Sequence, residues 1–389
     1  MNARRYIAAA AAAFALAAAS TAALAKTTFS VETDYRLGYD ANPFLSAGND
    51  VSATYIETSI APRLTVQSAK GQTTASGHFD RTGYLSNYGK NDAYGAVLET
   101  QQRVTTKLTV FGALRYDSEV IGQGRDDVTG DPIDAPDVNL IGLRRRSNTY
   151  AASGGWQYQA TPKDVISADG GYTATRFSNG PGGADSDNYG GRIGWKHAIN
   201  AKTKVGISGS VYRIEYDTAG LSTLIMQPQL TFSTVLSPTW SVDASLGMSF
   251  SRLNLPGIAP SVNTQGLAGS LQLCHTGRRT NLCLVADRSV SASGAGSTVE
   301  RTQVGVNYRH TLSERMTFLW NGSYSRSEGQ AGLLGTRQFV SGRGGLEYQL
   351  QRGLKIGAEG YYRDIYGQGF PVKADIGGDI YATIQLVKR

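Results

Sequence analysis

The sequence predicts an all-β protein, a closed antiparallel transmembrane β-barrel of about 18 strands, with 16 as the alternative count. Three observations lead to this prediction. Apolar and polar side chains alternate in long runs, the connections between the runs are alternately short and long, and no apolar run after residue 25 is long enough for a membrane helix. In hydrocarbon the backbone polar groups must be paired within the protein, and strands achieve that only in a closed sheet.

The composition excludes several other classes. The 389 residues include 47 Gly but only 11 Pro and show no G-X-Y period, which excludes collagen and low-complexity chains. A hydrophobic content of 40% is too low for a bundle of membrane helices. The net charge of +7 falls to +5 (36 basic minus 31 acidic residues) without Arg4 and Arg5, and these charges are interspersed. Nucleic acid is therefore not a predicted partner.

Residues 1–25 are predicted to be a signal peptide. Arg4 and Arg5 form a positive start, an Ala-rich apolar run extends from Ile7 to Leu24, and Ala23 to Ala25 form an A-x-A cleavage site. The alternative is a retained transmembrane anchor, because a run of about 18 residues can just span a bilayer. The remaining residues, 26–389, are predicted to form one domain, the barrel itself.

The strand pattern is clearest after Trp240. Six apolar side chains at even positions, from Trp240 to Phe250, alternate with six small or polar ones, from Ser241 to Ser251. This period of two is that of a strand with one apolar face. Segments 29–40, 107–117 and 375–386 show the same alternation, with their charged residues on one face.

The connections predict the strand count and the orientation of the barrel. Eight short turns are expected at 69–72, 105–106, 161–164, 200–203, 237–238, 275–281, 312–315 and 351–353. Nine longer loops are expected at 41–50, 86–92, 121–146, 178–187, 217–220, 254–262, 292–298, 328–335 and 366–374. Seventeen connections join eighteen strands, and about 20 residues per strand and connection suits a bacterial outer-membrane barrel with short periplasmic turns. A β-propeller or β-helix would have shorter strands.

The segment from Asp34 to Phe44, a strand that runs into YDANPF, resembles the first strand of outer-membrane β-barrel porins found with bacterial exopolysaccharide systems. The hairpin pattern extends this likeness over most of the chain as an architectural match. The resemblance implies location in the outer membrane of a Gram-negative bacterium and a channel that passes or accompanies a secreted polysaccharide. It also implies contact with lipid, lipopolysaccharide and the barrel assembly machinery.

Cys274 and Cys283 flank a predicted turn and share the face opposite to the apolar residues of their strands. If Arg278 and Arg279 form the centre of the turn, the two cysteines lie directly opposite each other and can form a disulfide. Two free thiols are the first alternative. A metal site with His275 is the second, although this hairpin offers too few ligands.

Charged residues at polar-face positions are candidates to line the pore. They include Arg36, Arg115, Arg192, Lys196, Asp375 and Asp379. Loop 121–146 is the longest connection, and its acidic part precedes Arg144, Arg145 and Arg146. A long loop can fold into the lumen and narrow it, so the three Arg are expected to bias the mouth toward anions, including anionic saccharides. The alternative is a solvated surface loop.

No enzymatic activity, cofactor or metal is predicted. Ser76, His78 and Asp80 share one strand face, but residues two apart on a strand are about 6.5–7 Å apart, too far for a catalytic triad. The leading function is an outer-membrane channel for hydrophilic solutes, with exopolysaccharide export as its specific version. The alternatives are a non-conducting barrel that docks a periplasmic export partner and an outer-membrane hydrolase.

Overall fold

The computed structural model describes residues 26–46, 52–121, 137–178, 182–217, 220–255, 259–329, 335–367 and 372–388. They form one sheet of eighteen antiparallel strands, so the predicted fold class and count are confirmed and the count of 16 is wrong. The strands are β1 Lys26–Asp40, β2 Ala53–Gln67, β3 Gly71–Tyr84, β4 Lys90–Arg103, β5 Leu108–Ile121, β6 Arg145–Gln159, β7 Asp164–Phe177, β8 Ser186–Ala198, β9 Thr203–Tyr216, β10 Ser222–Ser237, β11 Trp240–Leu255, β12 Ala259–Thr276, β13 Thr280–Ser293, β14 Ser297–Thr311, β15 Met316–Gly329, β16 Arg337–Gln351, β17 Leu354–Tyr366 and β18 Asp375–Lys388.

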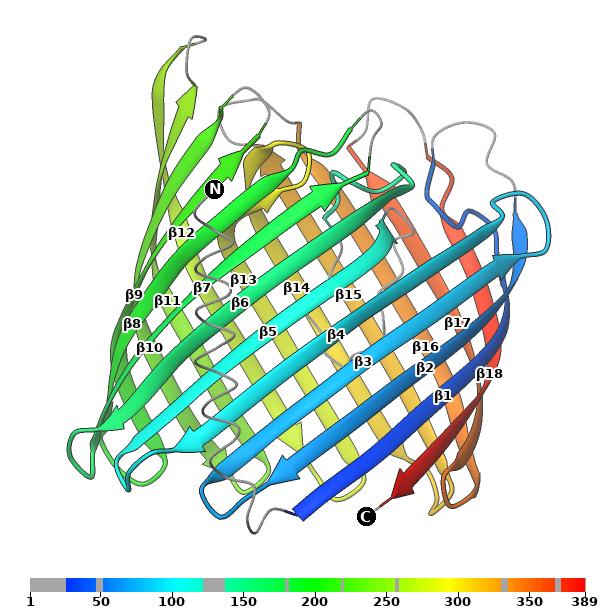
Figure 1. Ribbon diagram of the computed structural model, residues 1–389, viewed down its shortest axis with the longest axis horizontal. Coiled ribbons are helices and arrows are strands. Elements are labelled where there is room, and N and C mark those ends of the chain that lie inside the picture. Colours follow the sequence, from blue (N-terminus) through cyan, green and yellow to red (C-terminus); the bar gives the residue numbers. More distant parts are fainter. Residues whose placement is uncertain are drawn as a thin grey trace.

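The barrel closes between its first and last strands. Each strand pairs with its neighbours in sequence, and β1 pairs with β18 from Phe29↔Lys388 to Asp40↔Gly377. Figure 1 shows the short turns together at one end, here called the turn end, and the other connections at the opposite end, the loop end. Two predicted long loops are short, because the strands around 254–262 and 292–298 continue until only residues 256–258 and 294–296 connect them.

The outer face of the wall is apolar. Ile193, Leu230, Leu246 and Ile376 are each more than 60% exposed, and they all stand at outward positions of their strands. The four Trp residues, 156, 195, 240 and 320, all lie within five residues of the turn end. Aromatic side chains beside an apolar belt are typical of a membrane interface, so this face is suited to lipid.

No helix among the described residues is both long and apolar enough to cross a membrane. Residues 1–25, the predicted signal peptide, lie outside the described residues.

Cys274 and Cys283 are direct register partners of β12 and β13, and a disulfide joins them with their Cα atoms 4.2 Å apart. Cysteines directly opposite each other in an antiparallel pair have the short separation that a disulfide requires. The bond closes the hairpin at the turn end.

We expect no free thiol in protein purified without reductant. The double variant C274S/C283S should lose about 2–3 kcal/mol of unfolding free energy, because the bond closes a short loop and restricts the unfolded chain. Thiol titration under denaturing conditions checks the bond, with C283S as the control that leaves a single thiol. Two titrated thiols in the wild-type protein would contradict the prediction.

Candidate functional site

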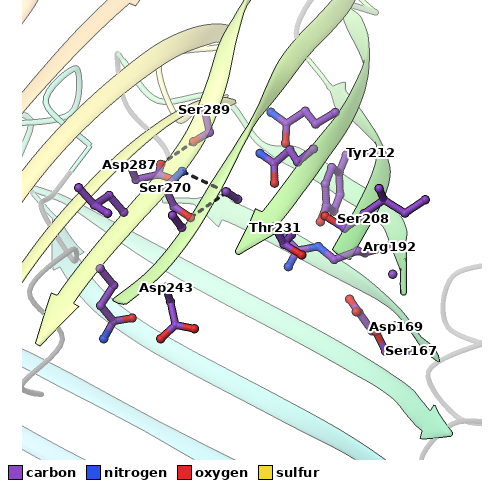
Figure 2. Close-up of a pocket in the computed structure, with 18 of the residues that line it drawn as sticks. Ser167, Asp169, Arg192, Ser208, Tyr212, Thr231, Asp243, Ser270, Asp287 and Ser289 are labelled. Carbon is purple, nitrogen blue, oxygen red and sulfur yellow. Dashed lines mark hydrogen bonds between the residues drawn. The ribbon is translucent and has the colours of Figure 1, made fainter. Parts of the chain in front are cut away.

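The lumen holds a cavity of about 660 Å³ along the inner faces of β7 to β13. Charged residues of both signs line it, among them Asp169, Arg192 and Asp243, which Figure 2 shows on different strands around the cavity. Between the charges the wall is rich in hydroxyl and amide side chains, which both donate and accept hydrogen bonds. This wall includes Ser167, Ser208, Gln227, Gln229, Thr231, Ser233, Ser245, Ser270, Gln272 and Ser289. The cavity is therefore suited to hydrated solutes.

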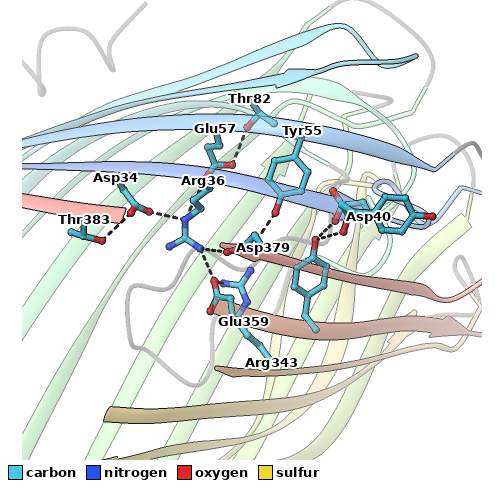
Figure 3. A network of polar contacts seen from close by, with 12 residues as sticks. Asp34, Arg36, Asp40, Tyr55, Glu57, Thr82, Arg343, Glu359, Asp379 and Thr383 are labelled. Atoms are coloured by element: carbon cyan, nitrogen blue, oxygen red, sulfur yellow. Dashed lines mark hydrogen bonds and ion pairs between the residues drawn. The ribbon is translucent and has the colours of Figure 1, made fainter. Parts of the chain in front are cut away.

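The opposite wall of the lumen, from β16 through β18 to β2, carries charges that are paired with one another. Arg36 on β1 is central: its guanidinium lies 2.6 Å from Asp34, 2.5 Å from Glu359 and 3.5 Å from Asp379. Figure 3 shows these groups around Arg36. Arg343 approaches Glu359 at 3.6 Å. Because these carboxylates come from β1, β17 and β18, the network stabilises the seam where the barrel closes.

Tyr55 completes this network through a close approach that only glycine permits. Tyr55 on β2 is the register partner of Gly38 on β1, and a Cβ atom on Gly38 would lie 2.3 Å from the Tyr55 hydroxyl oxygen. Without that atom the ring lies over Gly38, and its hydroxyl donates to Asp379 at 3.2 Å. Such cross-strand pairing of an aromatic residue with glycine covers the exposed backbone and fixes the register.

A second buried group of polar residues lies nearer the loop end. Arg363 bonds Asp375 on β18 and lies 3.7 Å from Asp40 on β1. Asp40 also accepts a hydrogen bond from Tyr361. Asp375 accepts the backbone N–H of Asn42 at 2.7 Å, so this group holds the start of the β1–β2 connection.

Two connections fold inward and meet inside the loop end. Leu45 of the β1–β2 connection and Val138 and Ile141 of the β5–β6 connection form one buried cluster with Phe339 of β16 and Ile365 of β17. Residues 137–144 therefore cross the barrel from β5 and β6 to the opposite wall. We call residues 41–46 and 137–144 together the loop-end plug.

Polar contacts from Asp137 and Asn139 attach the plug to β13, β15, β16 and the β13–β14 connection. One carboxylate oxygen of Asp137 accepts the Ser293 hydroxyl at 2.9 Å and the Gly294 N–H at 2.8 Å. The Asn139 amide donates to the Ser327 hydroxyl at 3.0 Å, and Arg337 donates to the Asn139 carbonyl at 3.2 Å. These contacts span more than 150 residues of sequence, so the plug is part of the tertiary structure and the solvated-loop alternative is wrong for its described residues.

A third inward contact narrows the same end of the lumen. Ala184, Ile214, Tyr216 and Ile225 form a buried cluster, against which Val290 and Ala292 of β13 pack. The Tyr216 hydroxyl donates to the Ser297 carbonyl at 2.6 Å, although β9 and β14 are not neighbours in the sheet. Packed side chains therefore cover the cavity on the side of the loop end.

The structure separates the three Arg residues that the sequence places at the mouth. Arg144 lies over the rings of Phe44 and Tyr88, at 4.5 and 5.0 Å from their centroids. Arg145 and Arg146 begin β6 and point to opposite faces. Arg145 faces inward over Phe177. Arg146 faces outward, where it donates to Ser118 and to the Asp92 carbonyl. Adjacent strand residues alternate in direction, so the run does not make a cationic cluster.

The other predicted pore residues lie in different surroundings: some belong to one of the two walls, and Arg115 stands on β5 between them. Arg36, Asp375 and Asp379 belong to the paired groups near the seam, and Arg115 pairs with Asp117. Arg192 and Lys196 line the cavity. The acidic residues of loop 121–146 before Asp137 lie outside the described residues.

His78 and Asp80, which the sequence places on one strand face, both lie on β3. His78 Nε2 lies 3.8 Å from the Asp80 carboxylate, beyond hydrogen-bond distance. Within the described ranges no group of three or more His, Cys, Asp or Glu side chains is arranged to hold a metal ion.

The apolar residues of the plug are not among the site residues predicted from the sequence. Val138, Leu140, Ile141 and Leu143 follow a strongly acidic stretch of the longest connection. Apolar side chains within such a polar loop signal a segment that packs against something, and this signal could have identified the plug.

No known family description matches the sequence, and a search of curated proteins finds no relative. Among solved structures, the chain is similar to the outer membrane protein OpdK of Pseudomonas aeruginosa, with 11% identity, a TM-score of 0.49, and coverage of 93% of this chain and 99% of that one. It is also similar to OccK2 (OpdF) of the same organism, with 10% identity, a TM-score of 0.49, and coverage of 93% of this chain and 98% of that one. A third similar structure is that of the ferric citrate transporter FecA, with 12% identity, a TM-score of 0.47 and coverage of 88% of this chain. The match covers 60% of FecA, so this chain spans about three fifths of its length.

Proposed function

We propose that this protein is an outer-membrane channel for small hydrophilic solutes, with its turn end in the periplasm. The observation that carries the proposal is the combination of a closed barrel, an apolar outer face and a cavity of about 660 Å³ with a polar lining. A barrel that served only as an anchor has no need of a hydrated interior.

The size of the solute is limited by the loop end. The plug and the cluster around Ile214 and Ile225 occupy the lumen there, so a solute must pass between packed side chains. Export of a polysaccharide, which the sequence resemblance implies, requires these segments to move aside. The comparisons with known proteins give no support to that finer function, and we propose small solutes as the substrate class.

Planar-bilayer recording tests the proposal. The purified, refolded protein should produce discrete current steps of small conductance in KCl, and liposomes that contain it should swell in a monosaccharide but not in a large oligosaccharide. Circular dichroism and heat-dependent gel mobility should first show that the barrel is folded. Folded protein that conducts no ions would contradict the channel and favour a docking barrel.

A further inference from the structure

The connections at the two ends of the barrel carry opposite charge. The eight connections of the turn end contain a single acidic residue, Glu314. Their basic residues are Lys70, Lys107, Lys163, Lys202, Arg278, Arg279, Arg315 and Arg352. In the sequence of the nine connections of the loop end, the balance is reversed: Arg125, Arg144 and Lys373 stand against Asp50, Asp126, Asp127, Asp131, Asp134, Asp137, Asp185 and Asp217.

The basic residues of the turn end are not neutralised by neighbouring carboxylates among the residues that the structure describes. All eight basic residues are exposed, and none forms an ion pair within the described part of the chain. A ring of one sign of charge around an opening raises the local concentration of oppositely charged solutes, and low-dielectric walls focus this field. The turn end should therefore attract anions.

Three cations continue this field into the lumen. Arg192 and Lys196 of β8 and Lys204 of β9 line the cavity, all three are exposed, and none has an ion-pair partner among the described residues. Figure 2 shows Arg192 near the hydroxyl-bearing wall. The arginines of the opposite wall differ, because Arg36 and Arg363 are already held by carboxylates. The unpaired cations can bind an anion without breaking an existing pair.

The rest of the cavity lining limits how strongly an anion is held. Asp169, Asp243 and Asp287 share the cavity with the three cations, so its lining is balanced in formal charge. The excess positive charge lies in the turns instead. Conduction requires a solute to enter readily and to leave again, and a positive entrance before a balanced cavity meets both needs.

We propose that the turn-end half of the lumen is a vestibule that admits a small, multiply charged anion from the periplasmic side. This inference rests on the proposed channel function and adds the solute's charge class and side of entry. Arg192, Lys196 and Lys204 bind its negative groups in turn, and the hydroxyl and amide side chains of β9 to β13 bind its neutral polar groups. Lipid headgroups cannot reach these three cations, because they face the lumen.

The test is one-sided block of single-channel current in bilayers of phosphatidylcholine, which has no net charge. Tripolyphosphate is the anionic probe, and maltotriose is the neutral control. Orientation is established with T239C, in the one turn without charge, and a membrane-impermeant thiol reagent. We expect tripolyphosphate to block from the turn end about tenfold more strongly than from the loop end, and the block to weaken as salt rises. Maltotriose should show no such sidedness.

Matched variants distinguish the contribution of the lumen cations to the block from that of the turn cations. K196Q/K204Q removes lumen cations, K163Q/K202Q/R279Q removes turn cations, and R213Q is the control on the outer face. Each multiple variant should weaken the block about tenfold, and R213Q should not. Equal block from both sides, or block unchanged in both variants, would overturn the inference while channel function stands. A turn-variant effect seen only in bilayers with phosphatidylglycerol would assign the turns to lipid and also overturn it. Absence of any current would overturn the proposed function itself.

Discussion

The triple variant V138S/L140S/I141S is expected to raise the single-channel conductance several-fold. These three side chains are almost fully buried in the plug, where Val138 and Ile141 pack against Leu45, Phe339 and Ile365. Truncation of a buried apolar side chain typically costs about 2–5 kcal/mol, and a buried serine hydroxyl adds a further penalty. Without this packing, residues 137–144 should leave the lumen. The barrel itself should stay folded, because its wall is held by its own strand pairing.

Conductance in planar bilayers is the measurement, and L85S/V104S/L312S is the matched control. It makes the same chemical change at three exposed positions in connections. The control should conduct like the wild type and should fold normally. If the triple variant folds and its conductance is unchanged, residues 137–144 are not the constriction, and the narrow point of the lumen must lie elsewhere.

The substitution R36M is expected to lower the unfolding free energy by about 3 kcal/mol, the order of magnitude for removing one partner of a buried ion pair. Arg36 is surrounded by carboxylates of which Glu359 and Asp379 are 8% and 0% exposed. Without the guanidinium these two carboxylates remain together, largely shielded from water, and keep Arg343 at 3.6 Å from Glu359 and the Tyr55 hydroxyl on Asp379. The loss should weaken the contact between β1 and β18, where the barrel closes.

Denaturant unfolding in vesicles measures this effect. R36M/E359Q should recover part of the loss, because it removes one of the two carboxylates that repel each other once the guanidinium is gone. R213M is the control: Arg213 pairs with Glu215 at 2.9 Å, but both side chains are about half exposed, so the change should cost less than about 1 kcal/mol. Equal losses in R36M and R213M would mean that the network contributes no more than a surface ion pair.

The sequence alone was sufficient to predict the barrel wall. A strand that separates lipid from water must alternate its side chains, so the run from Trp240 to Ser251 identifies both a strand and its outer face. The hairpin between Cys274 and Cys283 could likewise be placed, because its register depends on residues only nine apart. Both features depend on residues that are close together in the sequence, so a local pattern is enough to predict them.

Only the tertiary structure decided what fills and charges the lumen. Asp137 contacts Ser293 and Gly294, more than 150 residues away. The apolar residues that follow it indicate that the loop packs against something, but no local pattern shows which distant strands it meets. The pairing of charges is equally non-local, although Arg36 and Arg192 look alike in sequence. Arg36 is enclosed by carboxylates from four strands, β1, β2, β17 and β18, whereas Arg192 faces a cavity without an ion-pair partner among the described residues. Alternation fixes which face a residue occupies, whereas its partners depend on which distant strands curve beside it when the barrel closes.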